Sequence, residues 1–300
     1  MSTIIPEISL ISLQNQSGSD LKILKEALNT HGFFTITDHD IDDSLLDESY
    51  TCAKEFFDLP EDIKNKYAKP EIGGARGYTP FGKETALGEN VADLKEFWHL
   101  GPEVNSDFDS RIHENINVDE LSNFNDHFNT LFTSLNHLGV KVLESIALVL
   151  ELPKDFFEEK VIRGNSTLRL LHYPPIESDK NILRARAHAD INLITLLVGA
   201  EEGGLEVQNK DDEWIPIKPN SNSIVCNIGD MMQLITEGNL KSTPHRVVEY
   251  SANDSKSRYS MPFFLHPSPE VSLKSVYDEN DKGVLAHDFL EERVKAIKLY

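Results

Sequence analysis

The sequence predicts a mainly β protein with flanking helices, built around a β-sandwich, jelly-roll or barrel core. From residue 166 onward the chain shows short β-type runs with turn residues between them and no intervening helices, which argues against parallel βαβ units. Before these runs, apolar residues recur with helical spacing over residues 119–152, which predicts one long, largely buried support helix. The N-terminal part mixes helical and β-type patterns. We therefore expect helices that cover a β core.

The N-terminal part contains a few elements whose patterns are clear. Alternating apolar and polar residues indicate a strand, as do runs of β-branched and aromatic residues. In order, the expected elements are a strand over residues 8–13, a helix over 20–30, a strand over 33–37 and a helix over 42–58. Gly32 and Pro60 end the two helices. The stretch from residue 73 to residue 95 carries a glycine-bearing loop and is assigned to no element.

The C-terminal part is expected to hold the strands of the core and a last helix. Strands are expected over residues 167–173, 185–189, 193–198, 205–208, 214–217, 223–227, 232–235, 246–250 and 258–265. Residues 288–299 are expected to be helical, because acidic residues come early and lysines late, as the helix dipole prefers. No repeat or Gly/Ser linker separates the two parts. We therefore expect an N-terminal region, 1–118, and a core region, 119–300, to form one cooperative unit.

The composition limits the class of protein and its partners. Hydrophobic residues make up 39% and charged residues 26% of the chain, which is typical of a soluble globular protein. The net charge of -21 argues against nucleic acid or an anionic membrane as the main partner. Cys52 and Cys226 lie far apart, and the N-terminus has neither the basic nor the apolar segment of a secretion signal, so we expect a cytoplasmic protein. No apolar run is long enough to span a bilayer, and a monomer is the default expectation.

His188 and Asp190 are the residues around which chemistry is expected. Side chains two residues apart on a strand point to the same side, so these two can share one metal ion. His245, between a Gly-Asn turn and a β-prone run, is the best third ligand. Two histidines and one carboxylate leave coordination positions open, as in non-haem Fe(II) oxygenases, whereas a structural zinc site closes four ligands, usually with cysteine. A His-x-Asp pair alone is a weak signal, so the neighbouring motifs decide.

Arg258 and Ser260 form a second pair that shares one face of a strand. A guanidinium fork beside a hydroxyl suits a carboxylate, and a buried dianion such as 2-oxoglutarate would satisfy this arginine. Taken singly, Arg258 is more often a surface ion-pair residue and His245 a strand-edge histidine. The combination of the two pairs is what supports a functional site.

Several motifs follow one another in a fixed order along nearly the whole chain. They are Gly32-Phe33-Phe34, Tyr173-Pro174-Pro175, His188-Ala189-Asp190, Leu193-Ile194-Thr195-Leu196-Leu197, Gly204-Leu205, Asn227-Ile228-Gly229-Asp230, Ser242 to Val247, and Arg258-Tyr259-Ser260. In this order they resemble the isopenicillin N synthase-like branch of the 2-oxoglutarate/Fe(II) oxygenases. Asp38 and Asp40 replace the usual asparagine and glycine of that family, and His172 replaces a tyrosine. Leu171 stands where many plant members carry asparagine, so the chain resembles microbial members.

The resemblance implies a double-stranded β-helix core in which His188, Asp190 and His245 bind Fe(II). It also implies that Arg258 and Ser260 bind the distal carboxylate of 2-oxoglutarate. The family's tyrosine, here Tyr173, often touches this co-substrate. The implied activity is the oxidation of a small molecule with O2 by hydroxylation, desaturation or ring closure, with release of succinate and CO2.

Two alternatives to this function stay open. An oxidase of the same fold has the iron site but does not use 2-oxoglutarate, and the Arg-x-Ser pair occurs in both kinds of enzyme. A non-catalytic metal-binding β-domain is disfavoured by the intact triad and the intact anion pair. Consumption of 2-oxoglutarate with Fe(II) and without added substrate discriminates all three.

The substrate contacts are expected to come from variable segments. They include Arg76, Tyr78 and the segment around Phe263. Arg184 and Arg186 share the alternation of His188, so we expect positive charge on the approach to the metal and a substrate carboxylate bound by Arg186. The competing interpretation is that both arginines form ordinary surface ion pairs.

Overall fold

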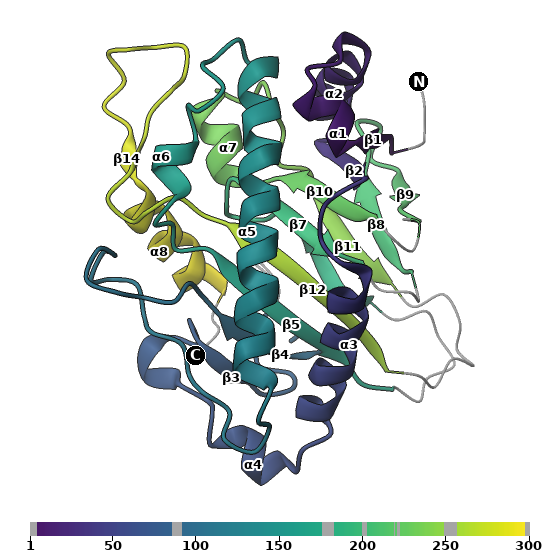
Figure 1. The fold of residues 1–300 in the computed structure, drawn as a ribbon, viewed down its shortest axis with the longest axis vertical. Coiled ribbons are helices and arrows are strands. Elements are labelled where there is room, and N and C mark those ends of the chain that lie inside the picture. The colour runs from purple at the N-terminus through teal and green to yellow at the C-terminus, as the bar shows by residue number, and fades with distance from the viewer. Residues whose placement is uncertain are drawn as a thin grey trace.

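The computed structural model describes residues 5–85, 92–175, 183–199, 203–218, 220, 223–248 and 257–297. Two β-sheets form its centre, and Figure 1 shows helices lying along one side of them. The strands are β1 (Glu7–Ser9), β2 (Phe33–Thr37), β3 (Gly77–Thr79), β4 (Glu96–Leu100), β5 (Thr167–Tyr173), β6 (Leu183–His188), β7 (Ile194–Val198), β8 (Leu205–Gln208), β9 (Trp214–Pro216), β10 (Ile224–Ile228), β11 (His245–Val248), β12 (Arg258–Leu265), β13 (Ser272–Leu273) and β14 (Val284–Leu285). The helices are α1 (Leu10–Gln14), α2 (Gly18–Thr30), α3 (Asp43–Phe57), α4 (Glu61–Asn65), the 3-10 turn η1 (Pro70–Ile72), α5 (Phe124–Val149), α6 (Glu158–Val161), α7 (Asp230–Ile235) and α8 (Ala286–Ile297).

The larger sheet contains strands from both ends of the sequence. Its eight strands run in the order β1-β2-β10-β7-β12-β5-β4-β3, and a four-stranded sheet has the order β6-β11-β8-β9. In the N-terminal region, β2 pairs with β10 at one side of the large sheet and β4 pairs with β5 at the other. Because the N-terminal region borders the core strands on both sides, we expect residues 1–118 and 119–300 to unfold together.

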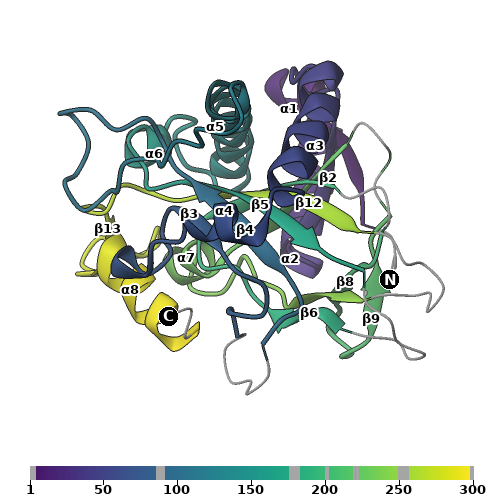
Figure 2. The same ribbon diagram turned by 90° about the horizontal axis from the view of Figure 1, so that it is seen from below.

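The large sheet has two faces with different neighbours. On its outer face, Leu168, Leu170 and Phe263 belong to an apolar core shared with the helices. On its inner face, Leu171 and Tyr173 belong to a second cluster that includes residues of the four-stranded sheet. The alternation of strand side chains therefore assigns every second residue to the space between the sheets. Figure 2 shows the four-stranded sheet on the opposite side of the large sheet from α5.

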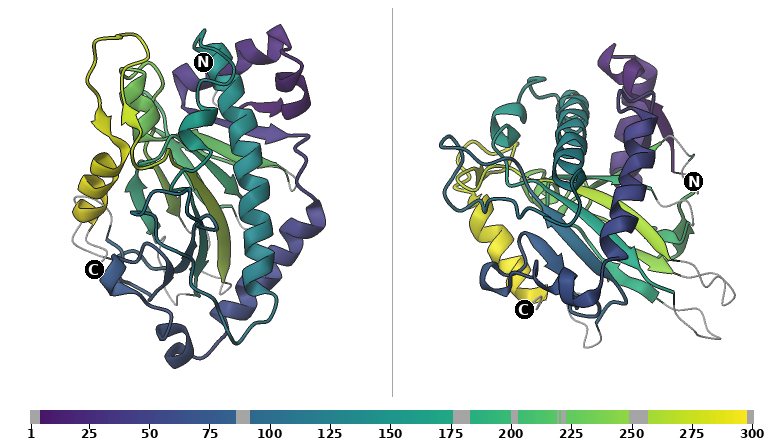
Figure 3. Two further views of the ribbon diagram at one scale, coloured as in Figure 1. Left: turned by 60° about the vertical axis from the view of Figure 1, so that its left-hand side comes forward. Right: turned by 60° about the horizontal axis from the view of Figure 1, so that its bottom comes forward.

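Helix α5 supports the outer face along most of its length. Its buried residues include Phe128, Leu131, Leu135 and Leu138, and Figure 3 shows it lying across the large sheet with α3 beside it. Gly139 lets the helix lie close to the sheet, because a Cβ at this position would be 3.2 Å from Cδ2 of Leu265. The support helix expected from the sequence is confirmed, although it begins and ends inside the expected bounds of 119–152.

One expected strand is wrong, and another is longer than the observed strand. Residues 232–235 lie in α7, where Met231, Met232 and Ile235 are buried, because a short apolar run fits a buried helix as well as a strand. The strand expected over residues 8–13 ends at Ser9, whose hydroxyl accepts a hydrogen bond from the amide of Ser12 at 3.4 Å and caps α1. The antiparallel pair of β3 and β4 is not among the expected elements. The far end of the strand expected over 246–250 lies outside the described residues.

Gly32 is a position where only glycine fits the observed backbone. Its φ is +65°, and an added Cβ would lie 2.2 Å from the carbonyl oxygen of Lys241. We expect Gly32→Ala to lower the free energy of unfolding by more than about 1 kcal/mol, because alanine is strained here and meets backbone atoms. Gly18→Ala is the matched control, since nothing lies within 4 Å of its added Cβ and alanine favours the helix. Denaturant unfolding measures both, and a wild-type stability for Gly32→Ala would contradict this role.

Candidate metal centre

Three side chains meet where the two antiparallel strands β6 and β11 adjoin. His188 is the last residue of β6, His245 is the first residue of β11, and the two lie directly opposite each other in the sheet. Asp190 follows two residues after His188. One ligand atom from each of the three lies within 4.8 Å of the others, and His245 Nε2 is 3.7 Å from Asp190 Oδ1. The fold therefore brings together the three residues that the sequence pattern singles out.

The two imidazoles are oriented by hydrogen bonds to backbone carbonyls. His188 Nδ1 donates to the carbonyl oxygen of Arg186 at 2.7 Å, and His245 Nδ1 donates to that of Thr243 at 3.3 Å. Each donation leaves the lone pair on Nε2, which is the form that binds a metal. Burial, with a smaller effect from the charge of His245, lowers the pKa of His188 to about 4. At neutral pH the His188 ring is therefore neutral, and its Nε2 can bind a metal.

Asp190 is fixed through one of its two oxygens. Oδ2 accepts hydrogen bonds from Thr195 Oγ1 at 2.6 Å and from Asn227 Nδ2 at 2.7 Å, while Oδ1 faces His245. The backbone carbonyl of Asp190 accepts the amide of Asp230 at 2.7 Å. Burial alone would raise the pKa of Asp190, but the two histidines and the two hydrogen bonds lower it below its ordinary value. Asp190 is therefore an ionised carboxylate whose Oδ1 could bind a metal.

Thr195 and Asn227 are two further residues of the candidate centre, and the sequence alone assigns no role to either. Thr195 lies on β7 and Asn227 on β10, so both reach Asp190 from the inner face of the large sheet. The available signal is their polarity, since each interrupts a run of buried apolar residues. Partners of this kind orient metal ligands and tune metal affinity.

The donor set fits a catalytic transition metal. Two imidazole nitrogens and one carboxylate oxygen form the set, and the described residues contain no other group of His, Cys, Asp or Glu side chains that could hold a metal. Three protein ligands on one side leave positions for other molecules, which is typical of non-haem Fe(II) sites. A closed four-ligand zinc site would require a further donor.

Arg258 and Ser260 lie together on β12, and Tyr173 lies opposite Arg258 on β5. Arg258 Nε donates to the carbonyl oxygen of Gly203 at 3.0 Å, Nη1 is 3.4 Å from Ser260 Oγ, and the guanidinium carbon lies 5.1 Å from the Tyr173 ring centre. Arg258 is only 8% exposed. In the described part of the chain no carboxylate lies within ion-pair distance of it. The structure therefore holds a buried cation that is suited to a ligand anion.

The two arginines before His188 have different surroundings. Arg184 is buried and donates to the carbonyl oxygen of Pro174. Arg186 Nη1 lies 3.8 Å from Asp93 Oδ1, and the same oxygen accepts the amide of Arg186 at 3.2 Å. Lys95 Nζ binds Asp93 at 2.9 Å, so the arginine belongs to a charged network beside the metal centre.

Two of the residues expected to contact substrate lie on the wrong face of the large sheet. Phe263 packs against Phe132 of α5 with ring centres 5.0 Å apart, and Tyr78 packs against Phe56 at 5.9 Å. Both belong to the outer core. With Arg258 and Ser260 facing inward, strand alternation turns Phe263 outward and Phe264 inward.

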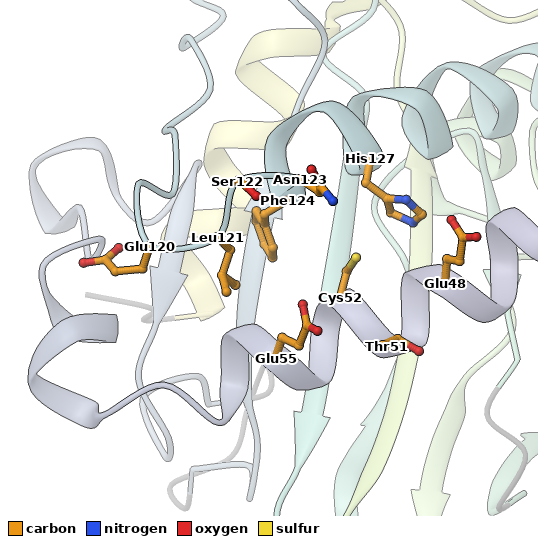
Figure 4. A pocket seen from close by; sticks show the side chains of 10 residues that line it. All are labelled: Glu48, Thr51, Cys52, Glu55, Glu120, Leu121, Ser122, Asn123, Phe124 and His127. Carbon is orange, nitrogen blue, oxygen red and sulfur yellow. The ribbon is translucent and has the colours of Figure 1, made fainter.

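A separate surface groove lies between α3 and the start of α5. Figure 4 shows side chains of Cys52, Glu55 and His127 directed into it. None of its lining residues belongs to the metal-binding group. Burial raises the pKa of the Cys52 thiol, which leaves it a weak nucleophile at neutral pH. The groove lies on the helical side, away from the space between the sheets.

Comparisons with known proteins agree with this geometry. The model of the 2OG-Fe(II) oxygenase superfamily matches residues 164–267, and that of the non-haem dioxygenase in morphine synthesis N-terminal region matches residues 5–120. A 2-oxoglutarate-Fe(II) type oxidoreductase of Aspergillus fumigatus is 31% identical over 259 residues, which cover 82% of this chain and 76% of that protein. A proline hydroxylase of Petromyces alliaceus is 32% identical over 269 residues, which cover 84% of this chain and 83% of that protein.

Solved structures extend the likeness to the whole fold. A 2OG-Fe(II) oxygenase family protein from Caulobacter crescentus is 42% identical with a TM-score of 0.86, covering 99% of this chain and 100% of that one. A full-length Neurospora crassa protein in complex with alpha-KG is 26% identical with a TM-score of 0.87, covering 97% of this chain and 96% of that one. The chain therefore belongs to the 2-oxoglutarate/Fe(II) oxygenase superfamily, in its isopenicillin N synthase-like branch.

Proposed function

We propose that this 2-oxoglutarate-dependent dioxygenase oxidises a small, carboxylate-bearing molecule. In this proposal His188, Asp190 and His245 bind Fe(II), and Arg258 and Ser260 bind the distal carboxylate of 2-oxoglutarate beside Tyr173. The carrying observation is the buried Arg258, which lacks a carboxylate partner among the described residues and shares the inner face with the residues that hold Asp190. An unpaired buried charge is costly, so a dicarboxylate bound there is stabilised.

The residues of the chain hold the reacting groups and keep water out. Iron and 2-oxoglutarate, when bound, supply the oxidising chemistry of the family. Asp190 contributes a carboxylate that is already ionised and His188 contributes a neutral imidazole, so no proton has to leave His188 on metal binding at neutral pH. Buried apolar side chains between the sheets limit water near the centre; they include Phe33, Phe97, Leu171, Val207 and Val247.

The substrate is proposed to approach past Arg186. Members of the family act on small molecules of varied chemistry: one relative is named a proline hydroxylase, and a structure of the Neurospora crassa protein contains thymine. Arg186 lies two residues before His188 and is partly exposed, with its guanidinium beside Asp93. In a protein of net charge -21, this arginine gives the approach a local positive charge that favours an anionic substrate.

The proposed setting is a reducing cytoplasm, with the protein as a monomer that does not bind nucleic acid. Both cysteines are free, which supports a reducing compartment. The strong negative charge supports the exclusion of nucleic acid. Among the described helices, none has the length and apolar character to cross a membrane.

A second candidate is an oxidase of the same fold that does not use 2-oxoglutarate. One observation favours it: a 1-aminocyclopropane-1-carboxylate oxidase of Dictyostelium discoideum is 31% identical over 307 residues, which cover 88% of this chain. The purified protein with Fe(II), O2 and 2-oxoglutarate, without substrate, distinguishes the two. We expect slow formation of succinate in amounts equal to the 2-oxoglutarate consumed. Iron binding without any 2-oxoglutarate consumption would support the oxidase instead.

We expect Arg258→Met to weaken 2-oxoglutarate binding strongly. Losing the charged partner of a buried carboxylate costs on the order of 2–5 kcal/mol, which corresponds to a dissociation constant at least about 30-fold higher. Calorimetric titration of the iron-loaded protein under anaerobic conditions measures this constant. Arg163→Met, at an exposed position, is the control and is expected to bind as wild type does. An unchanged constant for Arg258→Met would remove this residue from the co-substrate site.

We expect Thr195→Val to weaken iron binding while the fold is kept. Valine has a similar shape but cannot donate to Asp190 Oδ2, which then keeps only Asn227. Loss of such a partner typically lowers metal affinity about 10–100-fold. Competition with a chelator measures the Fe(II) dissociation constant. Thr133→Val is the matched control, because the Thr133 hydroxyl is exposed and bonds only within α5. Equal iron affinity of the wild type, Thr195→Val and Thr133→Val would contradict the proposed role of the hydrogen bond from Thr195 to Asp190.

A further inference from the structure

Arg76 is a second buried arginine without a carboxylate partner. It is 2% exposed, and among the described residues no carboxylate lies within ion-pair distance of it. Nη1 donates to the carbonyl oxygen of Ala75 at 2.7 Å and Nη2 to Asn165 Oδ1 at 3.0 Å, but Nε is buried without a hydrogen-bond partner. Burial lowers the pKa of Arg76 to about 10, so the guanidinium keeps its charge at neutral pH. A cation in this state is suited to an incoming anion.

His266 is a second polar side chain with an unpaired buried atom, and it lies near Arg76. Its Nε2 has no hydrogen-bond partner. The segment that binds Arg76 also binds His266, because the amide of Asn165 donates to the carbonyl oxygen of Pro267 at 3.2 Å and Ser166 Oγ accepts the amide of His266 at 3.2 Å. The charge of Arg76 also contributes, after burial, to the lowered pKa of His266.

The two residues lie on the inner face of the large sheet, close to the metal centre. Phe264 pairs with Thr195, whose hydroxyl holds Asp190, and His266 is the next inward position after Phe264. The guanidinium of Arg76 lies where a side chain on Gly101 would point, since an added Cβ there would be 2.0 Å from Nη2. Gly101 continues the inward alternation of Phe97 and His99 on β4.

Within the described residues, the inner face therefore carries at each end a buried arginine that has no carboxylate partner. Arg258 begins β12 and His266 follows its last residue, eight positions further along the chain, which is roughly 26 Å of extended strand. Thr195, which donates a hydrogen bond to Asp190, pairs with Phe264 and therefore lies between these two ends. One end is already assigned to the distal carboxylate of 2-oxoglutarate, so the other end is available to the substrate.

The hydrogen-bonding groups at this end define the class of ligand. Arg76 Nε offers a charged donor, which suits a carboxylate oxygen. His266 Nδ1 donates to the carbonyl oxygen of Phe264 at 3.2 Å, so Nε2 offers a lone pair and requires a donor from the ligand. Burial first, and then the charge of Arg76, lowers the pKa of His266 to about 4, so the ring is neutral at pH 7. The ligand must therefore present an anionic oxygen and an N–H or O–H group.

We propose that Arg76 and His266 anchor the substrate, a small carboxylic acid that carries a hydroxyl or N–H donor next to its carboxylate. The inference rests on the proposed function, because it places the substrate on the same face and beside the same metal. Arg186 then acts at the approach and Arg76 at the inner end. Neither Arg76 nor His266 is needed to hold the metal or 2-oxoglutarate.

Three probes with the same three-carbon skeleton separate the two contacts. Lactate has the carboxylate and the hydroxyl, propionate lacks the hydroxyl, and lactamide lacks the charge. Each is titrated calorimetrically under anaerobic conditions into protein loaded with Fe(II) and saturated with 2-oxoglutarate, which keeps Arg258 occupied. We expect lactate to bind at least about tenfold more tightly than propionate or lactamide, since each of the other two probes leaves one buried group of the protein without its partner.

Variants assign the contacts to residues. Arg76→Met should weaken lactate binding at least about tenfold, through loss of a charged hydrogen bond. His266→Phe should bring lactate down to the affinity of propionate and leave propionate unchanged, while His266→Gln, which keeps an acceptor, should restore the preference. Arg163→Met is the exposed control. Circular dichroism and iron content verify that each variant is folded and loaded, so the His266 pair keeps the test valid if Arg76→Met fails to fold.

The inference is overturned if no probe gives a saturable heat, if lactate and propionate bind equally to wild type, or if their preference survives in His266→Phe. Consumption of 2-oxoglutarate by the wild-type protein without substrate is measured in parallel. If that consumption occurs and the affinities for the probes do not change in the Arg76 and His266 variants, the proposed substrate anchor is wrong and the proposed function stands. If it does not occur, the proposed function itself is wrong.

Discussion

The carboxylate of Asp190 is the constraint on which the centre depends. Its Oδ2 is held by Thr195 and Asn227 from the large sheet, while its Oδ1 faces His245 in the four-stranded sheet. A buried charge of this kind is tolerated only when its hydrogen bonds are made and an opposite charge lies near it. The hydrogen bonds come from one sheet, and the two imidazoles that lie beside the carboxylate come from the other. The two sheets therefore have to keep a fixed relative position for the centre to exist.

The two faces of the large sheet carry different kinds of residues. Apolar residues on the outer face pack against the helices, and the residues of the candidate site lie on the inner face. On β12, Met261, Phe263 and Leu265 pack toward the helices, whereas Arg258 and Ser260 face the other sheet. Helix α5 packs on the outer face without reaching the centre, and Gly139 brings it close to Leu265. Because this packing is independent of the inner face, substitutions between the sheets can change ligand binding without removing the main apolar core. Polar residues can then occupy the inner face at both ends.

The parts of the site that follow from local spacing are predictable from the sequence. His188 and Asp190 are two residues apart at the end of one strand, and Arg258 and Ser260 are two apart on another, so alternation alone gives their common side. The position of His245 opposite His188 depends on strand pairing, and only the order of the motifs indicates it. The expected substrate contact of Phe263 is wrong. Phe263 lies five positions after Arg258, so strand alternation already places the two side chains on opposite faces, and the expectation does not take this spacing into account.

The remaining features depend on contacts between distant segments. Asn227 reaches Asp190 across 37 positions of sequence, and Asn165 reaches Arg76 across 89. No local pattern marks such pairs. Residues 232–235 resemble a strand because a short apolar run has no periodicity of its own, and only the preceding Gly229 and the burial of Met231 identify the helix. A buried atom without a hydrogen-bond partner among the described residues, such as Arg76 Nε or His266 Nε2, is visible only once the fold is known.

The most direct test of this account is a crystal structure with Fe(II) and 2-oxoglutarate, in which anomalous scattering at the iron edge locates the metal. The account predicts one iron ion bound by Nε2 of His188, Nε2 of His245 and Oδ1 of Asp190, with Oδ2 still bonded to Thr195 and Asn227 and the distal carboxylate of 2-oxoglutarate on Arg258. Coordination through both oxygens of Asp190, a fourth protein ligand, or 2-oxoglutarate bound away from Arg258 would contradict it.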